Sequence, residues 1–271
     1  MTKGLPLTSI EIKNAELEIL EVFDKTFADS GLRYSLAGGT LLGAIRHKGF
    51  IPWDDDIDVN VPRPDFDRFV STFIQGGLPE GYAIECYPAG TTDPIFVKLV
   101  RLDFAVKERY SSECRHLWID VFPVDGLPTS MHDLAVLYKR VRRLRLLTLL
   151  ATADPREGRS TFRKLAKRFL VPFLNELRIG DWAARRLVSQ CRKVPLTAAD
   201  RIGGIAWGLY GTGEALPGDA FDRLVQVEFE GAQYWAIEDW ETYLKGLYGD
   251  FWKLPPESAR VGHDMEVYRS E

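Results

Sequence analysis

The sequence has no apolar run long enough to cross a membrane, and its amino end lacks the apolar core of a signal peptide. The apolar residues there are interrupted by charged ones, including Glu11, Lys13 and Glu16. We therefore expect a cytoplasmic protein that has no membrane-spanning segment.

Cysteine and histidine are scarce, with three and four residues respectively. Cys86, Cys114 and Cys191 lie far apart, which excludes a disulfide framework and any of the usual zinc spacings. Such a scattered set is typical of a reducing compartment. We expect free thiols.

Internal repeats, low-complexity tracts and the Walker and dinucleotide-binding motifs are also missing. What is present is an ordinary globular composition, with 45% apolar and 27% charged residues in a chain of 271. The order of the expected elements predicts an α/β (α+β) protein. Its core occupies residues 1–130, a helical insertion follows over 131–195, and residues 196–271 return to the core.

The residue pattern predicts a helix that begins with a capping box, Thr8 with Glu11, and ends near Gly31. A short strand over 33–37 leads into a helix over 41–46, and a second strand covers 57–61. A helix capped by Asp65 comes next, then strands over 82–86, 95–102 and 117–121. The helical stretch from 131 to 191 is expected to break near Asp154-Pro155 and again at Val171-Pro172.

Four carboxylates crowd the start of the strand over 57–61, and they belong to Asp54, Asp55, Asp56 and Asp58. Asp56 and Asp58 are two apart, so on a strand both point to the same face. Mg²⁺ is usually held by one or two carboxylates together with substrate phosphates and waters. We predict a Mg²⁺ site at Asp56 and Asp58, where Mn²⁺ is an alternative ion. The other interpretation is a solvated acidic loop.

Asp120 is the single acid of a strongly apolar stretch, residues 117–123. An unpaired charge in such a strand costs several kcal/mol. We therefore predict that Asp120 is a third metal ligand from a neighbouring strand. A buried, hydrogen-bonded aspartate is the simpler alternative.

A glycine turn, Gly38-Gly39-Thr40, joins the first expected strand to a helix. Glycine lets a ligand approach the backbone, and a helix N-terminus favours phosphate. We predict that this turn binds the phosphates of a nucleotide, although a tight turn without a ligand has the same sequence pattern.

Five further residues are candidates for substrate binding. Arg46 and Lys48 precede the acidic strand, Lys98 and Arg101 lie on the strand expected over 95–102, and His263 lies in the tail. A cation at the first four positions is suited to a diphosphate, but each is also an ordinary surface charge.

Residues 36–59, which hold both the glycine turn and the acidic run, closely resemble the LicD family. Residues 119–128 and the tail from Tyr248 to His263 match it as well. That family includes phosphocholine transferases and is related to fukutin and the fukutin-related protein. The resemblance implies a nucleotidyltransferase-type core sheet.

The resemblance also implies a reaction. Family members transfer a phospho-alcohol, such as phosphocholine from CDP-choline, to a hydroxyl of a glycan or of a lipid-linked glycan precursor, and some relatives use CDP-ribitol. Asp56, Asp58 and Asp120 would then be the catalytic residues, and Asp120 is a candidate acceptor of the hydroxyl proton. Two alternatives remain: transfer of the nucleoside monophosphate itself, or nucleotide binding without catalysis.

Basic residues are concentrated between Lys139 and Lys193, which contains 16 Lys and Arg but four acids. Basic amphipathic helices lie on anionic membranes through their apolar face. We therefore expect peripheral contact with the inner face of the membrane, while simple packing of these helices on the core is the alternative. With a sequence pI near 5.7, we expect no nucleic-acid partner.

Overall fold

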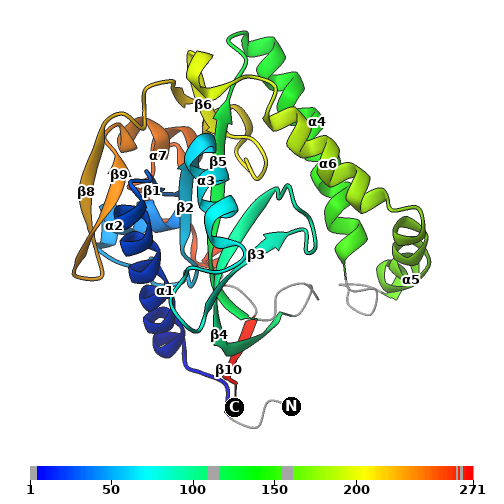
Figure 1. Ribbon diagram of the computed structural model, residues 1–271, viewed down its shortest axis with the longest axis horizontal. Coiled ribbons are helices and arrows are strands. Elements are labelled where there is room, and N and C mark those ends of the chain that lie inside the picture. Colours follow the sequence, from blue (N-terminus) through cyan, green and yellow to red (C-terminus); the bar gives the residue numbers. More distant parts are fainter. Residues whose placement is uncertain (1–4, 109–115, 154–160, 261, 263–264, 271) are drawn as a thin grey trace.

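The computed structural model describes residues 5–108, 116–153, 161–260, 262 and 265–270. Cys114 and His263 lie outside the described residues. The helices are α1 (Ser9–Ser30), α2 (Gly38–His47), α3 (Arg63–Phe73), α4 (Met131–Thr152), α5 (Thr161–Glu176), α6 (Ile179–Cys191) and α7 (Trp240–Tyr248), and short 3₁₀ turns cover Leu196–Ala198, Gly211–Glu214 and Glu257–Ala259 (Figure 1).

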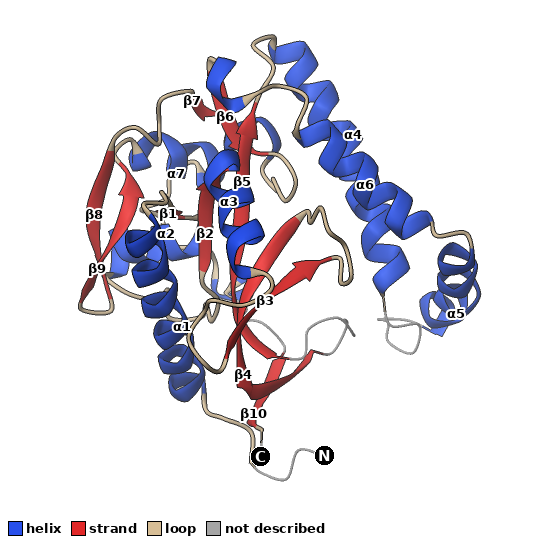
Figure 2. Ribbon diagram, in the orientation of Figure 1, coloured by secondary structure: helices blue, strands red, loops and turns tan. Residues whose placement is uncertain are grey.

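A mixed, eight-stranded sheet forms the centre of the molecule (Figure 2). Its strands are β1 (Ser35–Leu36), β2 (Asp58–Pro62), β3 (Tyr82–Tyr87), β4 (Phe96–Glu108), β5 (His116–Gly126), β6 (Arg201–Gly204), β7 (Leu216–Pro217) and β10 (Met265–Arg269). The order β1-β2-β5-β4-β10 forms its main path, β3 pairs with β4, and β6 and β7 extend it from β5. β2 and β5 are parallel, and the other pairs are antiparallel. β8 (Leu224–Phe229) and β9 (Ala232–Ile237) form a separate hairpin.

The two faces of the sheet have different partners. Leu99, Ile119 and Val121 are fully buried on the face that α1 and α3 cover. On the opposite face, Asn60 of β2 donates to the Tyr243 hydroxyl of α7 at 3.2 Å. Because side chains alternate along a strand, Asp58 and Asp120 point to this second face, which we call the α7 face.

Local sequence signals determine the first helix as expected. The Thr8 side chain accepts from the Glu11 backbone N–H, Glu11 caps Thr8 in return, and Gly31 ends α1 in the left-handed region at φ 60°. Both ends of this helix are confirmed, because each depends only on residues one turn away.

Two boundary predictions are wrong. α3 begins at Arg63, and Asp65 lies in its first turn, where it accepts from Arg33 Nε at 3.0 Å instead of capping the helix. Pro172 lies inside α5, so the expected break at Val171-Pro172 does not occur there. The chain turns instead at Arg178, whose φ is 51°. The break expected at Asp154-Pro155 lies outside the described residues.

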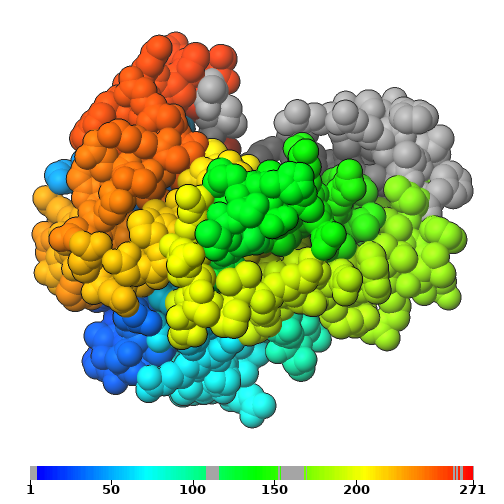
Figure 3. Space-filling view, turned by 90° about the horizontal axis from the view of Figure 1, so that it is seen from above, coloured from blue at the N-terminus to red at the C-terminus, as the bar shows by residue number. Residues whose placement is uncertain are grey.

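We call α4, α5 and α6 the helical arm. α4 and α6 pack together around a second hydrophobic cluster that includes Leu134, Val141 and Leu187. Viewed from above, the yellow-green part of the arm and the orange-to-red C-terminal segment lie on opposite sides of the molecule (Figure 3). None of the helices in the described ranges is long and apolar enough to span a membrane.

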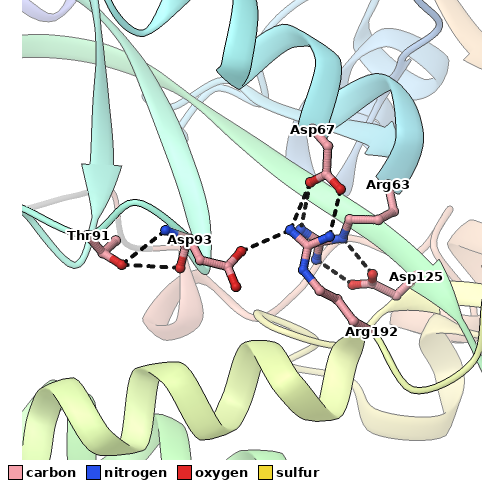
Figure 4. Close-up of polar contacts among 6 residues, drawn as sticks. All are labelled: Arg63, Asp67, Thr91, Asp93, Asp125 and Arg192. Carbon is pink, nitrogen blue, oxygen red and sulfur yellow. Dashed lines mark hydrogen bonds and ion pairs between the residues drawn. The ribbon is translucent and has the colours of Figure 1, made fainter.

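A network of ion pairs joins the arm to the core (Figure 4). Arg63 of α3 forms a buried bidentate pair with Asp125 of β5, with distances of 2.6 and 2.7 Å. Arg192, at the end of α6, binds Asp67 of α3 at 2.6 and 2.9 Å and Asp93 at 2.9 Å. Arg–carboxylate forks of this kind fix orientation as well as distance, so the network holds α6 in place against α3.

Candidate active site

A row of charged side chains crosses three adjacent strands on the α7 face. Asp58 of β2 is directly opposite Asp120 of β5, and Asp120 is directly opposite Lys98 of β4. Lys98 Nζ lies 3.1 Å from Asp120 Oδ1 and 3.6 Å from the centre of the Trp118 ring. Trp118 Nε1 donates to Asp120 Oδ2 at 2.9 Å. The sheet register therefore brings together Asp58, Asp120 and Lys98, which the sequence singled out separately.

The environment of Asp58 disfavours its charge. Burial raises the pKa of Asp58 well above its ordinary value, and the carboxylates of Asp56, Asp120 and Asp54 raise it further, while Lys98 opposes the rise. Like charges in a partly dry site make the ionised form costly. A bound cation would remove this cost, so the carboxylates here have the chemistry of a cation site.

The glycine turn packs directly on these carboxylates. A Cβ placed on Gly39 would lie 2.5 Å from Asp54 Oδ2, and one on Gly38 would lie 3.1 Å from Asp58 Oδ2. Gly38 also has a positive φ of 50°. Thr40 is 3% exposed, and its hydroxyl accepts from the Asp58 backbone N–H at 2.8 Å. The turn thus positions the acidic strand, and Thr40 contributes by holding the backbone of Asp58.

A cavity of about 720 Å³, which we call the main cavity, opens beside this turn. Asp56 and Asp58 lie on its wall, with Gly39 at the start of α2. Its other lining residues include Trp53, Arg46, Tyr210, Tyr248, Asp250, Lys253 and Pro255. The volume is within the range of small-molecule binding pockets.

The basic residues that were predicted to bind substrate lie in different parts of the structure. Arg46 lines the main cavity and is anchored by a 2.7 Å hydrogen bond from its Nη1 to the Phe251 carbonyl. Lys98 lies beside Asp120, as described above. Lys48 is exposed at the end of α2, where it adopts φ 62°.

Arg101 is on the other face of the sheet. It follows Lys98 by three residues without a register shift between them, so its side chain points toward α1. There it pairs with Glu18 of α1 and with Asp103, the latter at 2.8 Å. The structure therefore does not bring Arg101 to the carboxylates. The sequence does indicate this, because two residues of one strand that are three positions apart point to opposite faces.

The arrangement fits a metal held partly by its substrate. No three His, Cys, Asp or Glu side chains within the described ranges are grouped closely enough to bind one ion by themselves. The Asp120 carboxylate is directed to Lys98 and Trp118, whereas Asp56 and Asp58 line the cavity. Mg²⁺ commonly takes one or two carboxylates and completes its shell with phosphate oxygens and water. Asp56 and Asp58 satisfy that requirement.

A further carboxylate, Glu16 of α1, was not predicted. It is 2% exposed, and its Oε2 atom has no hydrogen-bond partner among the described residues. Burial raises the pKa of Glu16 well above its ordinary value, and Asp56 and Asp55 add to the rise. Its spacing of four from both Ile12 and Leu20 places it on the buried side of α1, which the sequence does indicate.

Comparison with known proteins agrees with this geometry. Residues 31–143 match the family model described as LicD/FKTN/FKRP, nucleotidyltransferase domain. The chain is 32% identical over 260 residues to the lipopolysaccharide cholinephosphotransferase LicD of Haemophilus influenzae, covering 92% of this chain and 93% of the relative.

Other relatives match only part of the chain. The chain is 34% identical over 94 residues to the human ribitol 5-phosphate transferase FKRP, covering 35% of this chain and 17% of that protein. An uncharacterized protein of Rickettsia prowazekii is 47% identical over 56 residues, 20% of this chain and 21% of the relative. Since the first relative matches over nearly its whole length, the chain belongs to the LicD family of nucleotidyltransferase-type proteins.

Proposed function

We propose that this protein is a phosphotransferase that moves a phospho-alcohol, such as phosphocholine, from a CDP-alcohol to a hydroxyl group of a glycan or glycan precursor. The observation that carries the proposal is the main cavity, whose lining includes Asp56, Asp58, Arg46 and, at the N-terminus of α2, Gly39. The full-length relative is named as a cholinephosphotransferase that acts on lipopolysaccharide, which supports both the transferred group and the class of acceptor.

Asp56 and Asp58 would hold Mg²⁺, or Mn²⁺, together with the diphosphate of the donor. The ion would neutralise the diphosphate and stabilise CMP as it leaves. Arg46 offers a fixed guanidinium to the same phosphates, and Lys98 keeps a positive charge next to Asp120. The protein then contributes mainly positioning and charge stabilisation.

In the reaction, the acceptor oxygen attacks the phosphorus that carries the alcohol. The bond between this phosphorus and the bridging oxygen breaks, and CMP leaves with the electron pair. The acceptor hydroxyl loses its proton, for which Asp120 is the candidate base because it lies on the strand next to Asp58. Asp120 would then be the third member of the catalytic set.

Product analysis tests this proposal. With a CDP-choline labelled on both phosphates, we expect labelled CMP and a phosphocholine-modified acceptor. A CMP-modified acceptor would instead establish the alternative, nucleotidyl transfer. Asp56→Asn and Asp58→Asn should each abolish turnover without lowering the melting temperature, because they relieve charge repulsion. Asp29→Asn, in an exposed pair, is the matched control.

The helical arm supports a second, separate proposal, that the protein rests on an anionic membrane surface where a lipid-linked acceptor would be found. The arm exposes large apolar side chains at Leu170, Phe173, Leu177 and Trp182. The same segment also exposes basic side chains, at Arg168, Arg178, Arg185 and Arg186. Apolar contact combined with basic charge is the pattern of interfacial helices.

A further inference from the structure

A second, smaller cavity of about 80 Å³ adjoins the main cavity. Asp58 and Tyr210 line both. The smaller cavity is surrounded by the rings of Phe122, Trp207, Tyr210 and Tyr243 and by the carboxylate of Glu214. We call it the aromatic cavity.

Long-range packing builds the aromatic cavity. Phe122 follows Asp120 by two residues on the α7 face of β5, and Tyr243 comes from α7. Trp207 comes from the loop after β6. The turn that contains Glu214 meets α7 at a backbone contact, since a Cβ on Gly213 would lie 2.1 Å from the Gly246 carbonyl oxygen. This close approach fixes Glu214 next to Tyr243.

Glu214 is a buried carboxylate in this wall. It is 7% exposed, and it accepts hydrogen bonds from the backbone N–H groups of Tyr210, at 3.2 Å, and Leu209. No Lys or Arg in the described part of the chain forms an ion pair with it within 4.0 Å, and Arg145 acts on it only from a longer distance. A buried carboxylate without a close counter-ion is unfavourable, so a bound cation would stabilise the charged form of Glu214.

The rings have the chemistry that complements this charge. Cations bind over the faces of Trp and Tyr within about 6 Å of the ring centre, and cages of such rings recognise quaternary ammonium groups. Trp207 already contacts one cation, the guanidinium of Arg145, at 5.4 Å. Tyr210 is held in place by an edge-to-face contact with Tyr248 at 5.2 Å.

We propose that the aromatic cavity binds the cationic head group of the transferred alcohol, a trimethylammonium or smaller alkylammonium, with Glu214 as its counter-ion. This inference rests on the proposed function, because it places the head group next to a phosphate held at Asp58. The size is close: a cavity of about 150 Å³ holds the six heavy atoms of benzene, so in proportion one of 80 Å³ holds roughly three. A small alkylammonium group has about this size, and trimethylammonium has one heavy atom more.

The same wall discriminates against uncharged alcohols. A polyol such as ribitol has a hydroxyl on every carbon, and aromatic faces leave those hydroxyls without hydrogen-bond partners. The aromatic cavity therefore selects among donors by the charge and apolar surface of their alcohol, while the main cavity binds the part that all the donors share.

The test is direct binding of three compounds to the intact chain, measured by calorimetry with Mg²⁺ present. The compounds are CDP-choline, CDP-ribitol and CDP itself. We expect Glu214→Gln and Trp207→Leu, at two residues that line only the aromatic cavity, each to weaken CDP-choline binding roughly tenfold or more and to leave CDP binding unchanged. Tyr210→Phe keeps the ring and should bind CDP-choline like the wild type. Glu228→Gln, an exposed acid on β8, is the control for charge.

Two outcomes would overturn the inference: equal weakening of CDP-choline and CDP in Glu214→Gln, or wild-type affinity for CDP-choline in both Glu214→Gln and Trp207→Leu. These binding measurements do not depend on turnover.

They therefore separate a failure of this inference from a failure of the proposed function. If the protein transfers a nucleotidyl group and the proposed function fails, CMP release will be missing, but the difference in affinity between CDP-choline and CDP will persist. If only the aromatic cavity is misassigned, CMP release will remain and that difference will be unaffected by the variants.

Discussion

The hydroxyl of Thr40 accepts a hydrogen bond from the backbone N–H of Asp58 at 2.8 Å and thereby ties the first turn of α2 to the first residue of β2. Ala37 N–H donates to the Asp58 carbonyl at 3.0 Å, so both backbone groups of this residue are held by the glycine turn. The position of the Asp58 carboxylate thus depends on residues that precede it by about 20 positions.

The first prediction concerns Thr40→Val, which keeps the shape of the side chain but removes the acceptor. The Asp58 N–H would become a buried donor without a partner, at a cost of about 1–3 kcal/mol in the free energy of unfolding. We expect turnover to fall roughly 10- to 100-fold, because the carboxylate shifts from its working position. Thr40→Ser keeps the hydroxyl and should retain most of the activity. Unchanged kinetics in Thr40→Val would show that the bond does not position Asp58.

The second prediction concerns the buried pair of Arg63 and Asp125. Asp125 is 1% exposed, so Asp125→Asn removes the buried counter-ion of Arg63 and leaves the guanidinium with only Asp67, at 3.7 Å. We expect the free energy of unfolding to fall by about 3–5 kcal/mol in chemical denaturation. The exposed pair Lys25–Asp29 is the comparison, and Asp29→Asn should change stability by less than about 1 kcal/mol. A similar loss of unfolding free energy in Asp125→Asn and Asp29→Asn would contradict this difference between the buried and the exposed pair.

Local signals made part of this structure predictable. The capping box at Thr8 and the C-cap at Gly31 involve neighbours in sequence, and both were found correctly. Asp56 and Asp58 were expected on one strand face. β2 begins only at Asp58 and Asp56 precedes it, but both residues line the main cavity. In each case the relevant interaction spans at most a few residues.

Other features depend on which strands become neighbours. The ion pair of Lys98 with Asp120 follows from the β4–β5 register, and no local pattern in either strand specifies that register. Glu214 and Trp207 reach the aromatic cavity through packing between segments that are separated by more than 80 residues from Phe122. The sequence contains many aromatic residues, so their gathering at one place becomes visible only in the fold.

The third prediction is a pH dependence. Burial raises the pKa of Glu214 to about 7 in the folded protein, above the ordinary value of 4.5. Between these two values the folded state binds more protons than the unfolded state, so the contribution of Glu214 to stability is lost as the pH rises toward 7. Glu214→Gln lacks this titration. We expect the variant to gain stability relative to the wild type between pH 5 and pH 8, by up to about 3 kcal/mol.

Urea denaturation of both proteins at the two pH values measures this difference. The quantity to compare is the difference between the unfolding free energies of the two proteins, and how it changes with pH. The contributions of other titrating groups cancel in this difference. A difference that stays constant from pH 5 to pH 8 would mean that Glu214 titrates normally. The Glu228→Gln variant, in which an exposed acid is changed, should show such a constant difference.

The last prediction concerns the helical arm and its proposed membrane contact. Trp182 of α6 is 51% exposed and lies three and four residues before Arg185 and Arg186, so the three side chains share one side of the helix. Phe173 of α5 is 60% exposed. We expect the protein to co-sediment with anionic vesicles but not with neutral ones, and salt should weaken the binding because the arginines supply the attraction.

Two variants separate the contributions. Arg185→Glu with Arg186→Glu should remove most of the salt-sensitive binding, since each basic residue contributes about 1 kcal/mol at an anionic surface. Phe173→Ser with Trp182→Ser should weaken binding at every salt concentration, because the apolar contact is not screened. Lys25→Glu, on the exposed side of α1, is the charge control and should bind like the wild type. If the wild type stays in solution with strongly anionic vesicles at low salt, the arm does not bind membranes, and its basic surface would then be free to meet a soluble anionic acceptor.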